Sequence, residues 1–249
     1  MLSGLPSTLW RVSEFEQRYR TESSMPAGFD GPRVMTSSLM GELDSLQRRH
    51  VGRDVVEVLA ACRRAQEQAR LYVRLDDLIW PITVFPHSGV YHSRHDLLRT
   101  FESGVRDLEI VAVEPSFETE PGQRERERSD IAEFFRPLRP ALWSLAISSP
   151  TRGLLKEIAG TAAYRALRRL EQDGMVGSGA IGHAARRLHT EAASLRHVAQ
   201  WPGMSLERAI RLLNALYLTS NLMVTRSHPR ARPANSRSNT TAPPARSIG

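Results

Sequence analysis

The stretch RLYVRLDDLIWPITVFPHSGVYH, residues 70–92, begins with apolar side chains that alternate with polar or aromatic ones. Leu71, Val73 and Leu75 recur at every second position, which predicts a strand that is buried on one face. Pro81 has no N–H to donate, so we expect its strand to lie at a sheet edge or to bulge there. Short turns separate three such runs, and this pattern indicates an antiparallel meander. The predicted strands cover residues 70–75, 78–85 and 90–92.

Helical periodicity flanks the meander on both sides. Before it, leucines recur at spacings of four and three, and a second helix buries valine, leucine and Cys62 before an exposed charged run, Arg63 to Gln68. After it, Ser93 can cap a short helix, and a fourth strand follows. This order predicts an α+β fold. The expected helices lie within residues 38–68 and over 94–101, and the fourth strand lies over 108–113.

The second half of the chain is predicted to be mainly helical. A long helix is expected to start near Thr151 and to stop at Gly174. Further along, a helix ending at Gln200, a tight turn, a helix capped by Ser205 and a short strand form a winged-helix-like unit. Both ends of the chain lack a clear apolar pattern. The predicted divisions are a disordered segment (1–34), a small α+β domain (35–117), a linker (118–129), a helical region (130–182), the winged-helix-like unit (183–228) and a disordered basic tail (229–249).

Helix, tight turn, helix and short strand is the element order of a winged helix-turn-helix unit, and LRHVAQWPGMSLERAIRLLNALYLTSNLMVTR (195–226) resembles one. In the first half, DVVEVLAACRRAQEQARLYVRL (54–75), followed by a hairpin, a helix and a strand, resembles the small α+β domain of PatA-type bacterial regulators. The resemblance covers residues 36–116 and 183–226. It implies a role in signalling or regulation rather than in catalysis.

The charge of the chain is distributed unevenly. The 249 residues carry a formal net charge of +7, and residues 183–249 alone carry ten arginines and two glutamates. This segment is a candidate footprint for nucleic acid or another polyanion, and a solvated basic tail is the alternative. Lys156 is the only lysine. Because arginine codons are rich in G and C, a G/C-rich genome explains this bias without any phosphate-binding role.

The second helix of the winged-helix-like unit is the candidate for reading DNA in the major groove. Arginine pairs with guanine edges and asparagine with adenine edges, while arginines beyond the helix can meet phosphates. Glu207 would be repelled by phosphate, and the run LLNALYL is strongly apolar, so much of this helix is expected to be core. The candidate nucleic-acid-binding residues are Ser205, Arg208, Arg211, Asn214, Arg226 and Arg230.

Few residues point to catalysis. His87, His92 and His95 form a weak candidate metal site, since three or four converging donors are needed and the spacing matches no standard signature. The alternative is three ordinary histidines at the surface or in turns. Cys62 lies on an apolar helix side, which favours a buried small hydrophobe over a nucleophile. We therefore expect no enzyme activity and no cofactor.

These observations favour a non-catalytic bacterial regulatory or adaptor protein that acts through protein–protein contacts. A DNA-binding regulator is the alternative, and a metal-dependent enzyme that uses the histidines is the third. A single cysteine and the lack of a long apolar run predict a cytoplasmic location and no membrane span. The expected partner is a protein, a second copy of the chain, or DNA bound through residues 183–249.

Overall fold

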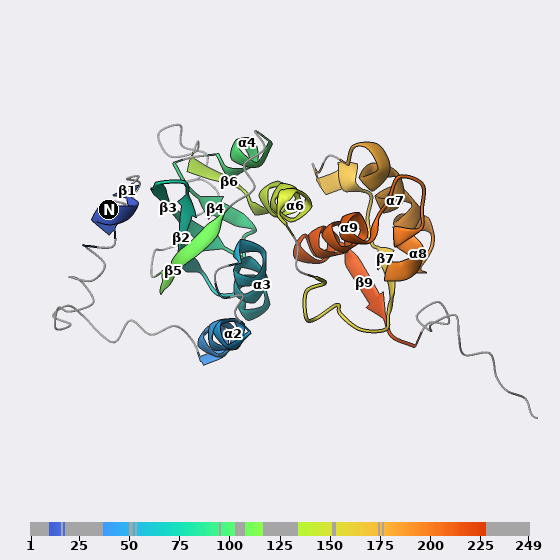
Figure 1. The fold of residues 1–249 in the computed structure, drawn as a ribbon, viewed down its shortest axis with the longest axis horizontal. Coiled ribbons are helices and arrows are strands. Elements are labelled where there is room, and N and C mark those ends of the chain that lie inside the picture. Colours follow the sequence, from blue (N-terminus) through green and yellow to red (C-terminus); the bar gives the residue numbers. More distant parts are fainter. Residues whose placement is uncertain are drawn as a thin grey trace, which may run out of the picture.

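The computed structural model describes residues 10–15, 17, 37–49, 52, 54–94, 96–102, 108–116, 134–150, 153–173, 175 and 177–227. These residues form a larger and a smaller antiparallel sheet with helices packed between them (Figure 1). The predicted α+β fold class is confirmed. The predicted linker at 118–129 and the basic tail at 229–249 lie outside the described residues.

The larger sheet contains the predicted meander. Its strands follow the order β5-β2-β3-β4-β6, and every pairing is antiparallel. All four predicted strands are confirmed, whereas β6 forms in a segment for which the sequence predicts helix. The strands are β2 (Ala69–Leu75), β3 (Leu78–Phe85), β4 (Val90–His92), β5 (Glu109–Pro115) and β6 (Phe135–Pro137).

The strand that contains Pro81 is not an edge strand. β3 pairs with β2 over residues 78–84 without a register shift, and its other side pairs with β1 (Trp10–Arg11) at residues 78–79 and with β4 at residues 83–85. Pro81 lies between these two short partners, so its missing N–H removes no bond from either pairing. The prediction of an edge or a bulge is therefore wrong.

Residues 10–15 are folded onto this sheet, although the sequence predicts disorder for residues 1–34. β1 extends the sheet, and the Phe15 side chain is only 6% exposed. The rings of Phe15 and Tyr72 lie 4.8 Å apart between centroids. Burial of the Phe15 ring offsets the conformational entropy that such a short segment loses when it becomes ordered. The irregular sequence pattern of the segment does not reveal this burial.

Three helices accompany the larger sheet: α2 (Ser37–Arg48), α3 (Val55–Ala65) and α4 (Leu97–Glu102). Asp54 starts α3, since its side chain accepts hydrogen bonds from the N–H groups of Val56 (2.9 Å) and Glu57 (3.2 Å). Gln66 ends the helix in the left-handed conformation at φ 53°. The valines, leucine and cysteine that the sequence assigns to the buried side of α3 are buried.

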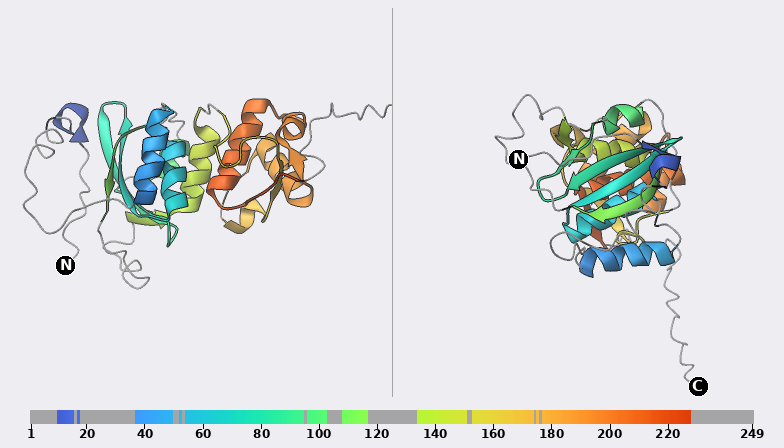
Figure 2. Two further views of the ribbon diagram at one scale, coloured as in Figure 1. Left: turned by 90° about the horizontal axis from the view of Figure 1, so that it is seen from below. Right: turned by 90° about the vertical axis from the view of Figure 1, so that its left-hand side faces the viewer.

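A central helix, α6 (Leu138–Ser148), separates the two halves of the molecule (Figure 2). It packs against α3, α4 and β4 on one side and against α9 (Leu206–Leu218) on the other. Leu142 is 1% exposed and Leu145 is 2% exposed. Because it is covered on both sides, α6 joins the two halves into one continuous apolar core.

The C-terminal half differs from the prediction at two places. The expected long helix from Thr151 to Gly174 is not formed; its middle is strand β7, which a loop with Gly160 at φ +95° precedes. The expected helix ending at Gln200 is two helices, because the intervening Ala193–Ser194 pairs with β7 as strand β8 and Ser194 caps the next helix. The elements are β7 (Ala163–Ala166), a 3-10 turn η2 (Leu170–Asp173), α7 (Gly179–Thr190), β8 (Ala193–Ser194), α8 (Leu195–Ala199) and β9 (Leu222–Thr225).

The order α8, turn, α9, β9 agrees with the predicted helix, turn, helix and strand. The smaller sheet has the order β8-β7-β9, so its central strand comes from a segment that precedes all these helices. In the described part of the chain, β9 therefore pairs with an earlier segment and not with a following hairpin strand. The winged-helix interpretation stays a prediction.

A substitution of Tyr164 on β7 tests whether its hydroxyl group holds the loop that precedes this strand. The side chain is fully buried, and its hydroxyl donates to the Ile158 carbonyl at 2.6 Å. Tyr164→Phe leaves that carbonyl without its donor, so we expect unfolding free energy to fall by about 1–2 kcal/mol in urea denaturation. Tyr91→Phe is the control: its hydroxyl lies 3.5 Å from Asp96 and should matter less. Equal losses in the two variants would contradict this assignment.

Candidate functional site

The first turn of α9 is exposed and rigidly held. The Ser205 hydroxyl accepts from the Arg208 N–H at 3.2 Å, and the Arg208 guanidinium donates to the Gly203 carbonyl. Ser205 and Arg208, two predicted DNA contacts, therefore lie together at an accessible helix start. Both already have intramolecular partners that stabilise this turn.

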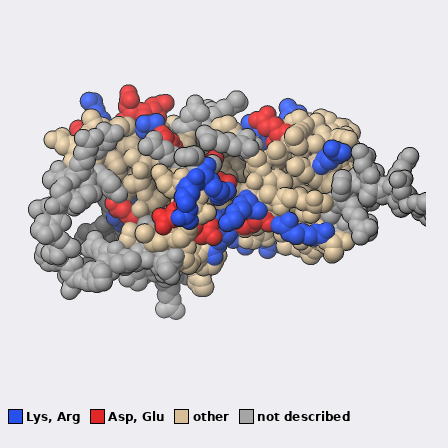
Figure 3. Space-filling model, turned by 60° about the horizontal axis from the view of Figure 1, so that its bottom comes forward, with Lys and Arg blue, Asp and Glu red and all other residues tan. Residues whose placement is uncertain are grey.

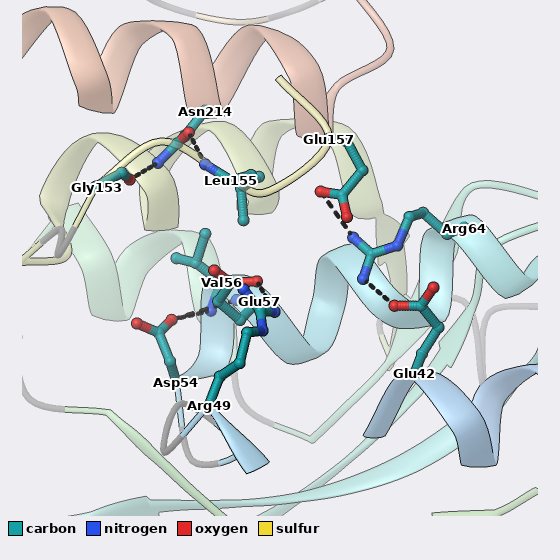
Figure 4. A network of polar contacts seen from close by, with 10 residues as sticks. All are labelled: Glu42, Arg49, Asp54, Val56, Glu57, Arg64, Gly153, Leu155, Glu157 and Asn214. Carbon is teal, nitrogen blue, oxygen red and sulfur yellow. Dashed lines mark hydrogen bonds and ion pairs between the residues drawn. The ribbon is translucent and has the colours of Figure 1, made fainter. Parts of the chain in front are cut away.

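Asn214 does not lie on an exposed face. Its residue is 2% exposed, and its side chain binds the loop that follows α6 (Figure 4). The side-chain oxygen accepts from the Leu155 N–H and the amide nitrogen donates to the Gly153 carbonyl, each at 3.0 Å. In this conformation Asn214 is inaccessible to a base, and its function is to fix the loop.

Arg211 also contacts a carbonyl in the last turn of α6, and Arg226 binds carbonyls of the segment that joins α6 to β7. Arg211 pairs with Glu207 and lies 3.4 Å from the Ile147 carbonyl, near the end of α6. Arg226 donates to the carbonyls of Ala159 (3.0 Å) and Glu157 (3.1 Å). These contacts differ from the predicted arrangement, in which both arginines face nucleic acid.

The five described candidates for DNA contact thus differ in accessibility: Ser205, Arg208 and Arg226 are exposed, Arg211 is half-buried and Asn214 is buried. Ser205 and Arg208 lie at the start of α9, whereas Arg211, Asn214 and Arg226 bind residues between 147 and 159. Arg230 lies outside the described residues. The sequence alone did not show this division, because it does not show that α6 covers a second side of α9.

The three histidines have different surroundings. His87 is exposed in the turn between β3 and β4, and His95 lies outside the described residues. His92 on β4 is 7% exposed, and its ring lies 4.8 Å from the ring of Phe135 between centroids. Burial, followed by the charges of Arg70 and Arg136, lowers the pKa of His92 to about 4. Within the described residues, no group of three or more His, Cys, Asp or Glu side chains is arranged to hold a metal ion.

Cys62 is buried on α3, as its position on the apolar side of the helix predicts. It is 1% exposed, and burial raises the pKa of its thiol to about 12. The thiol therefore stays protonated at neutral pH, and a nucleophile needs the thiolate.

Two arginines of α3 connect the two halves of the molecule, although the sequence predicts an exposed run from Arg63. The Arg64 guanidinium lies 2.7 Å from Glu42 on α2 and 3.2 Å from Glu157 in the loop after α6 (Figure 4). The hydrogen bond from Arg64 lowers the pKa of Glu42. Arg63 donates to the Ser220 hydroxyl beyond α9 at 2.6 Å. The spacing of Val56, Leu59 and Arg63 on one helix side could have indicated the partial burial of Arg63.

Basic and acidic side chains are mixed on the face drawn in Figure 3. The basic groups gather where the two halves meet, with acidic groups among them. A nucleic-acid footprint requires positive charge that dominates a surface. On this face basic and acidic side chains instead lie next to one another, as Arg64 does with Glu42 and Glu157.

Comparisons of the chain with models of protein families, with curated proteins and with solved structures found no match. The resemblance to PatA-type regulators stays a prediction. Within the described residues, none of the helices has the length and apolar character needed to cross a lipid bilayer.

Proposed function

We propose that the protein is a non-catalytic bacterial regulatory or adaptor protein that acts in the cytoplasm by binding another protein. The observation that carries this proposal is Leu206 in the first turn of α9. Its side chain is 57% exposed, more than any other large hydrophobic side chain in the described part of the chain. A leucine side chain at this position offers an apolar contact to a protein partner and no hydrogen-bond donor to a phosphate oxygen.

The turn around Leu206 is suited to such a contact because it is both exposed and ordered. Pro202, Gly203 and residues 205–208 are all exposed. The Met204 N–H donates to the Trp201 carbonyl at 2.9 Å, and Ser205 caps α9. A surface that is ordered before binding loses less conformational entropy when the partner docks.

The test compares Leu206→Asp with Leu167→Asp in affinity capture from a lysate of the source cells, followed by quantification of each captured protein. Leu167 is 46% exposed at the end of β7, so its variant makes the same chemical change elsewhere. We expect Leu206→Asp to lower recovery of the partner about tenfold or more, because buried apolar anchors dominate interface energy. Recovery that is equal for both variants and the unchanged protein would contradict the proposal.

DNA binding remains the second candidate because Ser205 and Arg208 lie at the accessible start of α9. Both belong to the strongly basic segment of residues 183–249. Fluorescence anisotropy on a labelled duplex, from about 50 to about 200 mM salt, tests it. A micromolar affinity that falls steeply with salt and weakens with Arg208→Ala would favour this candidate over protein binding. Affinity that Arg208→Ala leaves unchanged would count against it.

A further inference from the structure

A cavity of about 420 Å³ opens between the end of α3, the turn from β3 to β4 and the start of α6. Among the described residues that line it are Arg63, Gln66, His87, Ser88 and Arg139, together with three prolines. Two arginines and a histidine belong to this lining, and the lining residues that the structure describes include no Asp or Glu. The cavity is therefore a basic site with the volume of a small-molecule site.

Within the described residues, the Arg63 guanidinium forms no ion pair with a carboxylate. Burial, followed by the positive charge of Arg139, lowers the pKa of Arg63. Its hydrogen-bond partner is the Ser220 hydroxyl at 2.6 Å, which carries no charge. An anion bound beside Arg63 would favour the charged form of its guanidinium group.

The start of α6 adds to the positive potential. The helix is 11 residues long and begins at the cavity with Pro137, which forms no side-chain cap. The Leu138 N–H donates to the Gly89 carbonyl at 2.8 Å, so the turn that lines the cavity is attached to the helix start. The N-terminal end of a helix favours negative charge, in the same direction as the two arginines.

We propose that this cavity binds a small organic phosphate, with the phosphate group between Arg63 and Arg139. A phosphate dianion matches two guanidinium groups in charge, and arginine binds phosphate oxygens through paired N–H groups. The cavity is much larger than an inorganic phosphate ion, and the Gln66 amide and the prolines provide a surface for an attached organic group. Through Ser220, Arg63 also connects the site to the C-terminal half.

The first experiment is isothermal titration calorimetry of the full chain at constant ionic strength with inorganic phosphate, glucose 6-phosphate, AMP, glucose and adenosine. We expect at least one of the two phosphate esters to bind with a Kd of about 1 mM or tighter and about tenfold more tightly than inorganic phosphate. The uncharged glucose and adenosine should not bind. Absence of binding by all three phosphate probes, or equal affinity for esters and inorganic phosphate, would overturn the proposal.

Charge-removing variants locate the site. Arg63→Gln and Arg139→Gln should each weaken ester binding about tenfold or more, whereas Arg196→Gln, which removes an exposed arginine of α8, should not. If Arg63→Gln does not fold, NMR of the unchanged protein gives the answer, because the amide signals of Ser88, Gly89 and Arg139 should shift during the titration. Ester binding with no change in these signals would overturn the assignment.

Discussion

Asn214→Ala should lower the free energy of unfolding by about 2–4 kcal/mol, measured by urea denaturation at neutral pH. The asparagine is 2% exposed and holds the loop after α6 through the Leu155 N–H and the Gly153 carbonyl. Alanine leaves both groups without their partner. Leu155 is itself 1% exposed, so water cannot replace the lost acceptor without opening the core.

The control for this prediction is Glu207→Ala on the same helix. Glu207 is exposed, and in the described part of the chain its ion-pair partner is Arg211 at the surface, so its loss should cost less than about 1 kcal/mol. If Asn214 were a base-reading residue, as the alternative DNA-binding interpretation predicts, its replacement would leave stability nearly unchanged. A cost for Asn214→Ala no greater than that for Glu207→Ala would therefore contradict the structural role.

The case of Asn214 also shows what the sequence could predict for α9. Its Ser205 cap is a local feature and is confirmed. Of the predicted apolar ridge, Leu213 and Leu216 are buried and Ile210 is half-buried, whereas Leu206 is exposed. By helical spacing, Arg211 and Asn214 fall on the polar side, which the sequence alone assigns to solvent. In the folded chain α6 and the loop after it cover this side, and a distant segment cannot be foreseen from the periodicity of one helix.

Strand β7 was missed for a similar reason. Ala163–Ala166 is short and rich in alanine, so local propensity favours helix. Its extended form depends on pairing with β9, about 60 residues later in the chain, and with β8. In contrast, β2 has a clear period of two, β3 is a nearly continuous apolar run, and a turn separates them, so the information that specifies them is local.

The candidate site was harder to predict than the fold. The sequence assigns arginines to solvent or to phosphate, because charged side chains are usually exposed. In this protein Arg63, Arg64 and Arg226 join segments that are far apart in the sequence, by binding a hydroxyl, two carboxylates and two carbonyls. Such partners become visible only when the two halves are packed together.

Acidification should destabilise the protein through His92. Its folded-state pKa is lowered to about 4, whereas an unfolded histidine has a pKa near 6.5. Below pH 6.5 the unfolded chain therefore binds a proton that folded His92 excludes. The stability that neutral His92 retains above pH 6.5 is lost as the pH falls from about 6.5 to about 4, by a total on the order of 3 kcal/mol.

The comparison of His92→Gln with His87→Gln isolates this contribution from that of the carboxylates, which titrate in all variants. Urea denaturation from about pH 7 to about pH 4 should give a steeper loss of stability for the unchanged protein and for His87→Gln than for His92→Gln. His87 is exposed, so its replacement should not alter the slope. Parallel curves for all three proteins would mean that the folded chain accepts a proton at His92, and that the ring between Phe134 and Phe135 is not closed to water.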